Sequence, residues 1–171
     1  MANRVKHGLG PIAAHDARLF ILGSLPGDAS LAAQRYYAHP TNQFWRLLGE
    51  AIGEPLEAMG YAARLELLAE RGVGLWDVVA SAERVGSLDG AIRQAGHNPI
   101  ERLLVEFPRL EAIGFNGGTA AKAGRKLLGG AKGVELIDLP SSSAANAGPF
   151  ADKAEVWRQL GRFCTSGVSE A

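Results

Sequence analysis

Four short runs of almost uninterrupted apolar residues, each followed by turn-forming residues, constrain this fold more than any other feature of the chain. The runs lie at 18–23 (RLFILG), 74–79 (GLWDVV), 110–115 (LEAIGF) and 134–139 (VELIDL). Strands buried on both faces have this composition, because neither face meets water. Helical patterns lie between and after the runs, at 43–52, 62–71, 99–106, 119–128 and 152–163. Strands that alternate with helices predict an α/β sandwich with a parallel sheet.

The chain has 171 residues, 47% of them hydrophobic, which is enough for one domain with its own core. We expect a single domain over residues 1–171, with an irregular lead-in at 1–16 and a frayed tail at 165–171. No apolar run is long enough for a signal peptide or a membrane span. The sequence therefore predicts no membrane partner.

Cysteine and histidine usage limits the chemistry open to the chain. The single cysteine, Cys164, excludes an internal disulfide and a four-cysteine metal or iron–sulfur site. A lone cysteine suits the reducing cytoplasm, which is the expected location. The four histidines have no metal-ligand spacing, so we expect neither a metal nor another cofactor. The formal net charge is zero, so any binding of nucleic acid must use local positive charge.

The unusual polar sequence follows the ends of the predicted strands, and in open α/β sheets ligands bind at that edge. The longest such segment, 23–45, reads GSLPGDASLAAQRYYAHPTNQFW. Tyr36 and Tyr37 offer a flat face for a planar ring. Asn42 stands just before a predicted helix, so it is either an ordinary N-cap or a functional amide.

Two further loops suit phosphate groups. One opens a helix with glycines, and exposed amides at a helix N-terminus bind anions, although an ordinary tight turn has the same sequence. The other is rich in serine, whose hydroxyls and amides either grip a phosphate backbone or cap a turn. The candidate phosphate-binding residues are Gly117, Gly118, Thr119, Lys122, Ser141, Ser142 and Ser143.

Asp77 stands inside an apolar strand. Burying a carboxylate without partners is costly. Either backbone amides satisfy Asp77, or it accepts hydrogen bonds from a ligand.

Taken together, these segments resemble the uracil-DNA glycosylase superfamily, and most closely its hypoxanthine-DNA (deoxyinosine) glycosylase branch. The resemblance covers nearly the whole chain, and the first blocks are also similar to the mismatch-specific uracil-DNA glycosylases. It implies a three-layer α/β/α sandwich with a short, mostly parallel four-stranded sheet. The segments that carry it are GSLPG (23–27), YYAHPTNQFW (36–45), GLWDVVASAERVGSLDGAI (74–92), GFNGGTAAK (114–122) and LPSSSAANA (139–147).

The departures from the family pattern decide which residues are catalytic candidates. Most relatives carry a water-activating Asp, or a catalytic Asn, at the third position of the first turn, where this chain has Leu25. The resemblance therefore points to Asn42 as the residue that positions the attacking water, with Asp28 as a second candidate. Relatives specific for uracil usually have Asn where this chain has Asp77. A carboxylate there accepts the N1–H of hypoxanthine and repels O4 of uracil.

The resemblance implies a monofunctional enzyme that flips a deaminated base, most plausibly hypoxanthine, out of DNA and hydrolyses its N-glycosidic bond. The expected partner is DNA containing such a base, and the expected state is a monomer. The base is expected to stack on Tyr37, with support from Tyr36. Ser24 and His39 complete the predicted base-binding set, although a His-Pro turn is also an ordinary structural feature.

Three alternatives remain open from the sequence. The same fold acts on uracil or on G:T and G:U mismatches in related enzymes. A non-catalytic DNA-binding module would explain Leu25. A small-molecule α/β hydrolase is disfavoured, because no Gly-x-Ser-x-Gly elbow occurs.

Overall fold

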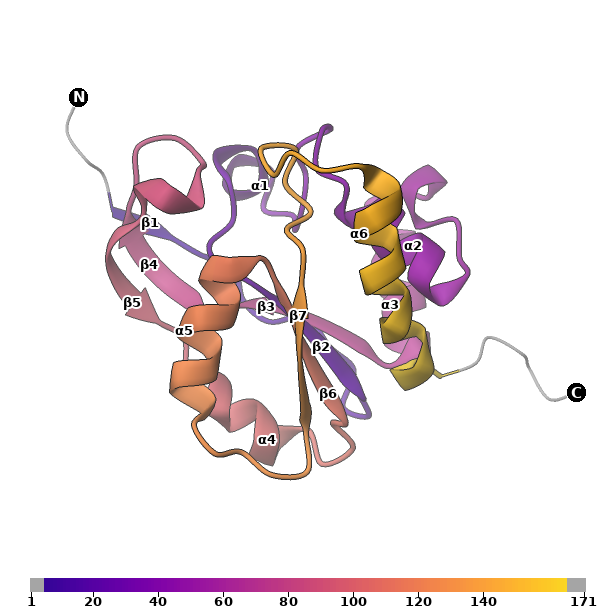
Figure 1. The fold of residues 1–171 in the computed structure, drawn as a ribbon. Coiled ribbons are helices and arrows are strands. Elements are labelled where there is room, and N and C mark those ends of the chain that lie inside the picture. The colour runs from indigo at the N-terminus through magenta and orange to yellow at the C-terminus, as the bar shows by residue number, and fades with distance from the viewer. Residues whose placement is uncertain (1–4, 166–171) are drawn as a thin grey trace, which may run out of the picture.

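A parallel sheet of four strands in the order β3-β2-β6-β7 forms the centre of the protein (Figure 1). The structure is a computed structural model, and it describes residues 5–165. Each neighbouring pair in this sheet is parallel. The predicted parallel sheet is thus confirmed. Its strands are β2 (Leu19–Gly23), β3 (Val73–Asp77), β6 (Ala112–Asn116) and β7 (Glu135–Leu139).

The central strand β2 shows how one apolar run builds two cores. Leu19 and Ile21 join the core on one face of the sheet, whereas Phe20 and Leu22 join the core on the other. This alternation follows from the two-residue period of a strand. One face of the sheet is covered by α2 (Phe44–Ile52), α3 (Tyr61–Arg71), α6 (Phe150–Trp157) and the 3₁₀ segment η4 (Arg158–Phe163). The other face is covered by the 3₁₀ segment η3 (Ile100–Arg102), α4 (Leu103–Glu106) and α5 (Gly118–Leu128). The predicted three-layer sandwich is confirmed (Figure 1).

A second, antiparallel sheet in the order β1-β4-β5 was not predicted. The run at 74–79 is not one strand: β3 ends at Asp77, because its neighbour β2 ends at Gly23. The chain then turns away as β4 and finds new partners on both sides. The strands of this sheet are β1 (Val5–His7), β4 (Val79–Glu83) and β5 (Arg93–His97).

The expectation of an irregular lead-in over 1–16 is wrong at Val5–His7, whereas residues 8–16 are irregular apart from one bridge. Residues Val5–His7 pair with β4, and Ile12 bridges Leu75. A strand of three residues, mostly exposed, carries no apolar signature that sequence reading can detect. Of the predicted tail, Thr165 donates its amide to the Arg71 carbonyl at 2.9 Å, and 166–171 lie outside the described residues. The remaining short elements are α1 (Asp28–Ala33), η1 (Leu56–Ala58) and η2 (Asp89–Ala91). Within residues 5–165 no helix has the length and apolar character needed to cross a membrane.

Gly124 allows α5 to lie close against the sheet. A Cβ at this position would stand 2.2 Å from Cε1 of Phe115, a buried residue of β6. We therefore expect Gly124→Ala to lower the free energy of unfolding by about 1–3 kcal/mol, measured by denaturant titration. Gly118→Ala is the control, since a Cβ there meets nothing within 4 Å. Equal stability of both variants would contradict this account of the packing.

Candidate active site

A cavity of about 720 Å³ opens at the carboxyl edge of the parallel sheet. Ligands bind at this edge in open α/β sheets, and the volume is in the range of small-ligand sites. The loops that follow all four parallel strands contribute to its walls. The lining residues fall within 23–30, 36–42, 77–89, 116–119 and 140–146.

Asp77 lies at the end of β3, where it lines the cavity but is only 3% exposed. Its Oδ2 is buried without a hydrogen-bond partner. Burial raises the pKa of this carboxyl to about 7; the charge of Asp89 raises it further, and Arg84 opposes the shift. Asp77 is therefore not satisfied by backbone amides at Oδ2, and it titrates near neutral pH.

The Tyr37 hydroxyl is a second buried polar atom without a partner. It approaches Asp77 beside Gly23: a Cβ on Gly23 would stand 2.6 Å from Asp77 Oδ1 and 2.9 Å from the Tyr37 oxygen. The Tyr37 ring stacks on Phe44 with centroids 3.7 Å apart, and its φ of 52° is unusual for a residue with a side chain. Burial raises the pKa of the Tyr37 hydroxyl. A backbone strained in this way is often found at functional sites.

Tyr36 has a structural place. Its side chain is 2% exposed, and its hydroxyl donates to the Gly10 carbonyl at 2.6 Å. Burial raises the pKa of the Tyr36 hydroxyl, which keeps it neutral. Tyr36 thus belongs to the core although it also borders the cavity, and at 2% exposure it presents little surface to a base.

Asn42 lines the cavity and also fixes the turn before α2. Its Oδ1 accepts the amide of Phe44 at 3.0 Å, although α2 takes Gln43 as its N-cap residue. His39, also on the wall, is exposed, and its Nδ1 lies 2.8 Å from the Thr41 hydroxyl. Capping and a role in the cavity are therefore compatible for Asn42.

Asn116, at the end of β6, holds the loop at 140–146 through its side chain. Asn116 was not among the site residues predicted from the sequence. The Asn116 amide donates to the Ser142 hydroxyl and accepts the Ser142 amide, both at 2.9 Å. Ser142 is 1% exposed, so its side chain is occupied within the fold rather than free for phosphate. Ser141 and Ser143 line the cavity, and the Ser143 amide donates to the Ser141 hydroxyl at 3.2 Å.

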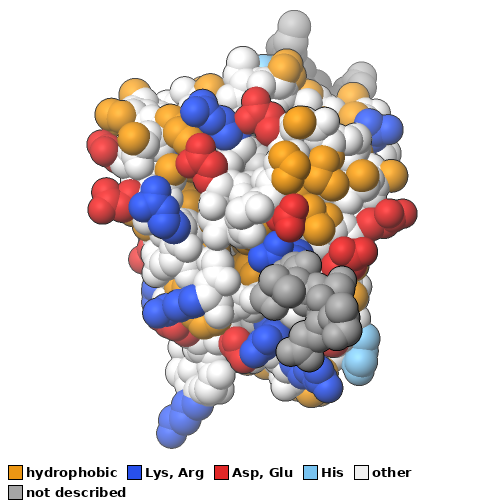
Figure 2. Space-filling model, turned by 90° about the vertical axis from the view of Figure 1, so that its right-hand side faces the viewer, with side chains coloured by type: hydrophobic (Ala, Val, Ile, Leu, Met, Phe, Trp, Pro, Cys, Tyr) orange, Lys and Arg blue, Asp and Glu red, His pale blue; other side chains and the backbone are white. Residues whose placement is uncertain are grey.

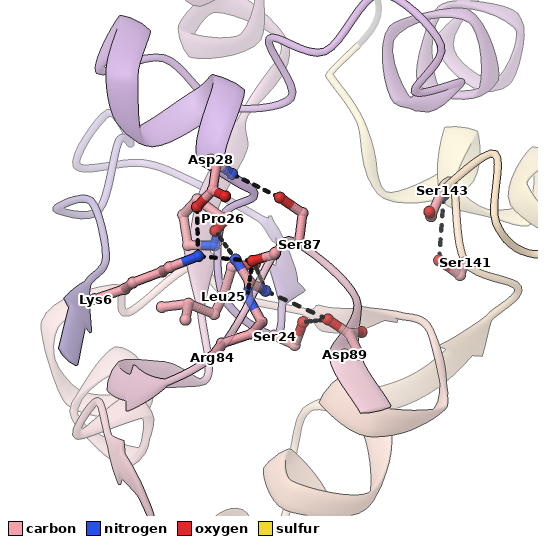
Figure 3. Close-up of polar contacts among 11 residues, drawn as sticks. Lys6, Ser24, Leu25, Pro26, Asp28, Arg84, Ser87, Asp89, Ser141 and Ser143 are labelled. Carbon is pink, nitrogen blue, oxygen red and sulfur yellow. Dashed lines mark hydrogen bonds and ion pairs between the residues drawn. The ribbon is translucent and has the colours of Figure 1, made fainter. Parts of the chain in front are cut away.

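The loop at 84–92 forms the wall of the cavity beside the turn that follows β2. Its buried Arg84 holds this turn in place (Figure 3). Arg84 donates to the carbonyls of Leu25, at 3.3 Å, and Pro26. Ser24 donates to Asp89 Oδ1 at 2.5 Å. Sequence reading missed Arg84 and Asp89, since they lie some 60 positions from the turn that they hold. The only indication of a role for Arg84 and Asp89 was that both lie in the segment at 74–92, one of the segments that resemble the family.

Asp28 lies outside this wall. Its carboxylate pairs with Lys6 Nζ at 2.6 Å, its side chain is 56% exposed, and it is not a lining residue (Figure 3). Its position on α1, which the sequence did not predict, turns it toward β1. Asp28 is therefore poorly placed to activate water in the cavity.

The start of α5 forms another part of the rim. Gly117 has a φ of 98°, a conformation that favours glycine, and it precedes Gly118 and Thr119, which line the cavity. Lys122 is exposed one turn further along α5 and does not line the cavity.

Over the face formed by α2, α3 and α6, acidic and basic side chains are interspersed (Figure 2).

The described residues contain no group of three or more His, Cys, Asp or Glu side chains arranged to hold a metal ion. A sheet-edge cavity with buried carboxylate, amide and hydroxyl groups is the usual form of a ligand-binding or active site in an α/β protein. Residues 10–161 match the family model described as the Uracil DNA glycosylase superfamily, and the chain belongs to this family. It is thus a DNA glycosylase, as the sequence predicted.

Two relatives extend the match over almost the whole chain. A protein of Methanosarcina acetivorans named hypoxanthine DNA glycosylase is 39% identical over 92% of this chain and 99% of its own. A protein of Methanosarcina barkeri with the same name is 38% identical over 90% of this chain and 96% of its own. A protein of Methanosarcina acetivorans solved by solution NMR, whose name proposes that it is a uracil DNA glycosylase, has a similar fold, with a TM-score of 0.83. Its sequence is 38% identical, and the match covers 93% of this chain and 98% of that chain.

Proposed function

We propose that this protein is a monofunctional glycosylase that removes hypoxanthine from deoxyinosine in DNA. One observation carries the proposal: Oδ2 of the buried carboxylate Asp77 stands without a hydrogen-bond partner in a cavity of about 720 Å³, which has room for a flipped nucleoside. An unpaired buried acceptor is stabilised by a ligand that donates a hydrogen bond. Hypoxanthine has such a donor at N1–H. The names of the two relatives support the same substrate.

The flipped base enters the cavity with its six-membered ring toward Asp77. Flipping costs a few kcal/mol and least for a mispaired base, such as hypoxanthine opposite thymine. Asp77 in its ionised form accepts N1–H. The hydroxyl of Tyr37 lies beside this carboxylate, and the Ser24 and His39 positions border the same space. The aromatic stack of Tyr37 on Phe44 keeps this wall rigid.

Hydrolysis then proceeds at C1′ of the flipped nucleotide. The C1′–N9 bond breaks through an oxocarbenium-like state, and the electron pair leaves with the base. Water positioned by Asn42 adds to C1′. The amide of Asn42 has almost no basicity, so it acts by orientation and by its dipole. Among residues 5–165 no lysine lines the cavity, which agrees with simple hydrolysis rather than a Schiff-base mechanism.

DNA phosphates are expected at the rim, on the amides of Gly117, Gly118 and Thr119 and on Ser141 and Ser143. Because the chain has no net charge, these contacts are few, and affinity should fall with salt. We propose that the protein works as a monomer, without a metal or cofactor, in the cytoplasm.

The proposal is tested by base release from matched labelled duplexes that contain deoxyinosine or deoxyuridine. The expected result is release of free hypoxanthine and at most weak release of uracil. Free bases are identified by chromatography, and strand cleavage before alkali treatment is expected to be absent. Preferential release of uracil would contradict the assigned role of Asp77. Binding without release of any base would favour a non-catalytic DNA-binding module.

A further inference from the structure

Asp89 is the second carboxylate that lines the cavity, and the roles proposed above leave it unused. It begins η2 in the 84–92 loop. Its Oδ1 accepts the Ser24 hydroxyl at 2.5 Å and lies 3.9 Å from Arg84 Nη1 (Figure 3). Both contacts are made through the same oxygen. The other oxygen, Oδ2, is therefore left for a different partner.

The anchors of this loop are themselves well held. Arg84 is 1% exposed and donates to the carbonyls of Pro26 and of Gly86, the latter at 3.1 Å. The Ser87 hydroxyl accepts the Asp28 amide at 2.9 Å. A carboxylate fixed in this way is positioned before substrate binds, and electrostatic catalysis depends on such preorganisation.

The hydrolysis requires a proton acceptor. The attacking water must lose a proton as its oxygen bonds to C1′, and the Asn42 amide cannot take it. Leu25, in the first turn, carries no polar atom and packs with Val79 in a small apolar cluster. Among residues 5–165, Asp77 and Asp89 are the carboxylates that line the cavity. These two are therefore the carboxylate candidates for the acceptor.

Their environments suit different tasks. Asp77 is buried, its carboxyl has a pKa raised to about 7, and it faces the base. The side chain of Asp89 is 36% exposed, and its Oδ1 lies 3.9 Å from Arg84 Nη1, so it is in contact with water and close to a positive charge. Two carboxylates in unlike surroundings facing one cavity are typical of enzymes that give them separate roles.

We propose that Asp89 is a catalytic residue that accepts the proton of the attacking water, with Ser24 and Arg84 as the residues that position it. The inference rests on the proposed glycosylase function. In this step the water oxygen bonds to C1′, the C1′–N9 bond breaks, and the water proton passes to Asp89 Oδ2. The proton then passes to the departing base or to solvent, so that one water is consumed for each base released.

Asp89→Asn tests the proposal, because asparagine can keep the Ser24 hydrogen bond while losing basicity. The single-turnover rate of hypoxanthine release should fall by roughly 100-fold or more. The affinity for deoxyinosine DNA and the unfolding midpoint should stay near those of the wild type. Glu111→Gln is the matched control: it removes a carboxylate paired with Arg18 at 2.8 Å, at the opposite edge of the sheet, and should retain full rate.

A second variant, Asp89→Gly, separates chemistry from structure. Added sodium formate should restore part of its rate, since a small carboxylate can occupy the vacated space. A rate for Asp89→Asn within threefold of the wild type would overturn the proposal. A loss of rate in Asp89→Gly that formate does not restore, together with a lower unfolding midpoint, would also overturn it. Asp89 would then only hold its loop in place.

The wild-type protein in the same assay distinguishes this inference from the proposed function. If it releases uracil instead of hypoxanthine, the proposed substrate fails, while a 100-fold loss for Asp89→Asn on uracil DNA still supports the proton acceptor. If it releases no base at all, both are overturned.

Discussion

Replacing Asn42 with alanine is expected to lower the single-turnover rate of hypoxanthine release by roughly 100- to 1000-fold, the loss typical of removing one positioned hydrogen-bonding side chain. The reason is geometric: Asn42 lines the cavity, and its Oδ1 is fixed by the Phe44 amide at 3.0 Å. An amide held in this way can orient water without adjustment. The measurement is quenched-flow or manual sampling of base release, with enzyme in excess over labelled deoxyinosine duplex.

Asn42→Ala also removes a cap-like hydrogen bond at the start of α2, which costs about 1 kcal/mol. Asn42→Ser controls for this effect, since serine can accept the same amide while it lacks the reach of the longer side chain. We expect Asn42→Ser to unfold near the wild-type midpoint and still to be slow. If both variants release hypoxanthine within threefold of the wild-type rate, Asn42 does not position the water.

The sheet was predictable because its signal is local. The central strands β2 and β6 are buried at every position, so that a nearly continuous apolar run marks each of them in the sequence. The antiparallel sheet has no such signal, since β1 is mostly exposed and pairs with β4 more than seventy positions away. Where β3 gives way to β4, the apolar run continues and conceals the change of partner.

The residues of the candidate site also differ in whether the sequence near them indicates their role. Asn42 and Asp77 stand out because each is a polar residue in a place that local rules disfavour or leave unexplained. Asn116 and Arg84 support the site through contacts that are distant in sequence, and nothing near them in the chain indicates those contacts. Tyr36 and Tyr37 are adjacent and both border the cavity, but neither the near-complete burial of Tyr36 nor the positive φ of Tyr37 is indicated by the sequence.

The site depends on the unpredicted sheet. Through β4 and β5, that sheet carries the 84–92 loop to the turn after β2, where Arg84 holds the carbonyls of Leu25 and Pro26. The same loop brings Asp89 next to Ser24. The parallel sheet thus places Asp77, the carboxylate proposed to bind the base, and the antiparallel sheet forms the wall beside it.

Asp77→Asn should produce the other large effect, on the pH dependence of stability. Burial raises the pKa of the Asp77 carboxyl from 3.8 to about 7 in the folded protein. Between about pH 4 and pH 7 the folded state therefore holds a proton that the unfolded chain releases, so the free energy of unfolding falls as pH rises. The contribution lost across this window is on the order of 4 kcal/mol.

Asparagine cannot titrate, so the variant should lack this loss, and its stability relative to the wild type should rise by a few kcal/mol from pH 4.5 to pH 8. Denaturant titrations of both proteins at several pH values measure the difference, in which the titrations of all other groups largely cancel. A constant difference across the range would mean that Asp77 ionises normally in the folded protein.

The same ionisation should appear in catalysis, with the opposite consequence. The ionised Asp77 accepts N1–H of hypoxanthine more strongly than the neutral acid does, so base release should increase as pH rises through about 7, where the folded protein becomes less stable. Asp77→Asn should lose this limb of the profile. A rate that falls as pH rises through 7 would mean that the protonated acid donates to the base instead. The unpaired Asp77 Oδ2 thus links a cost in stability to the ability to bind a base that offers a proton.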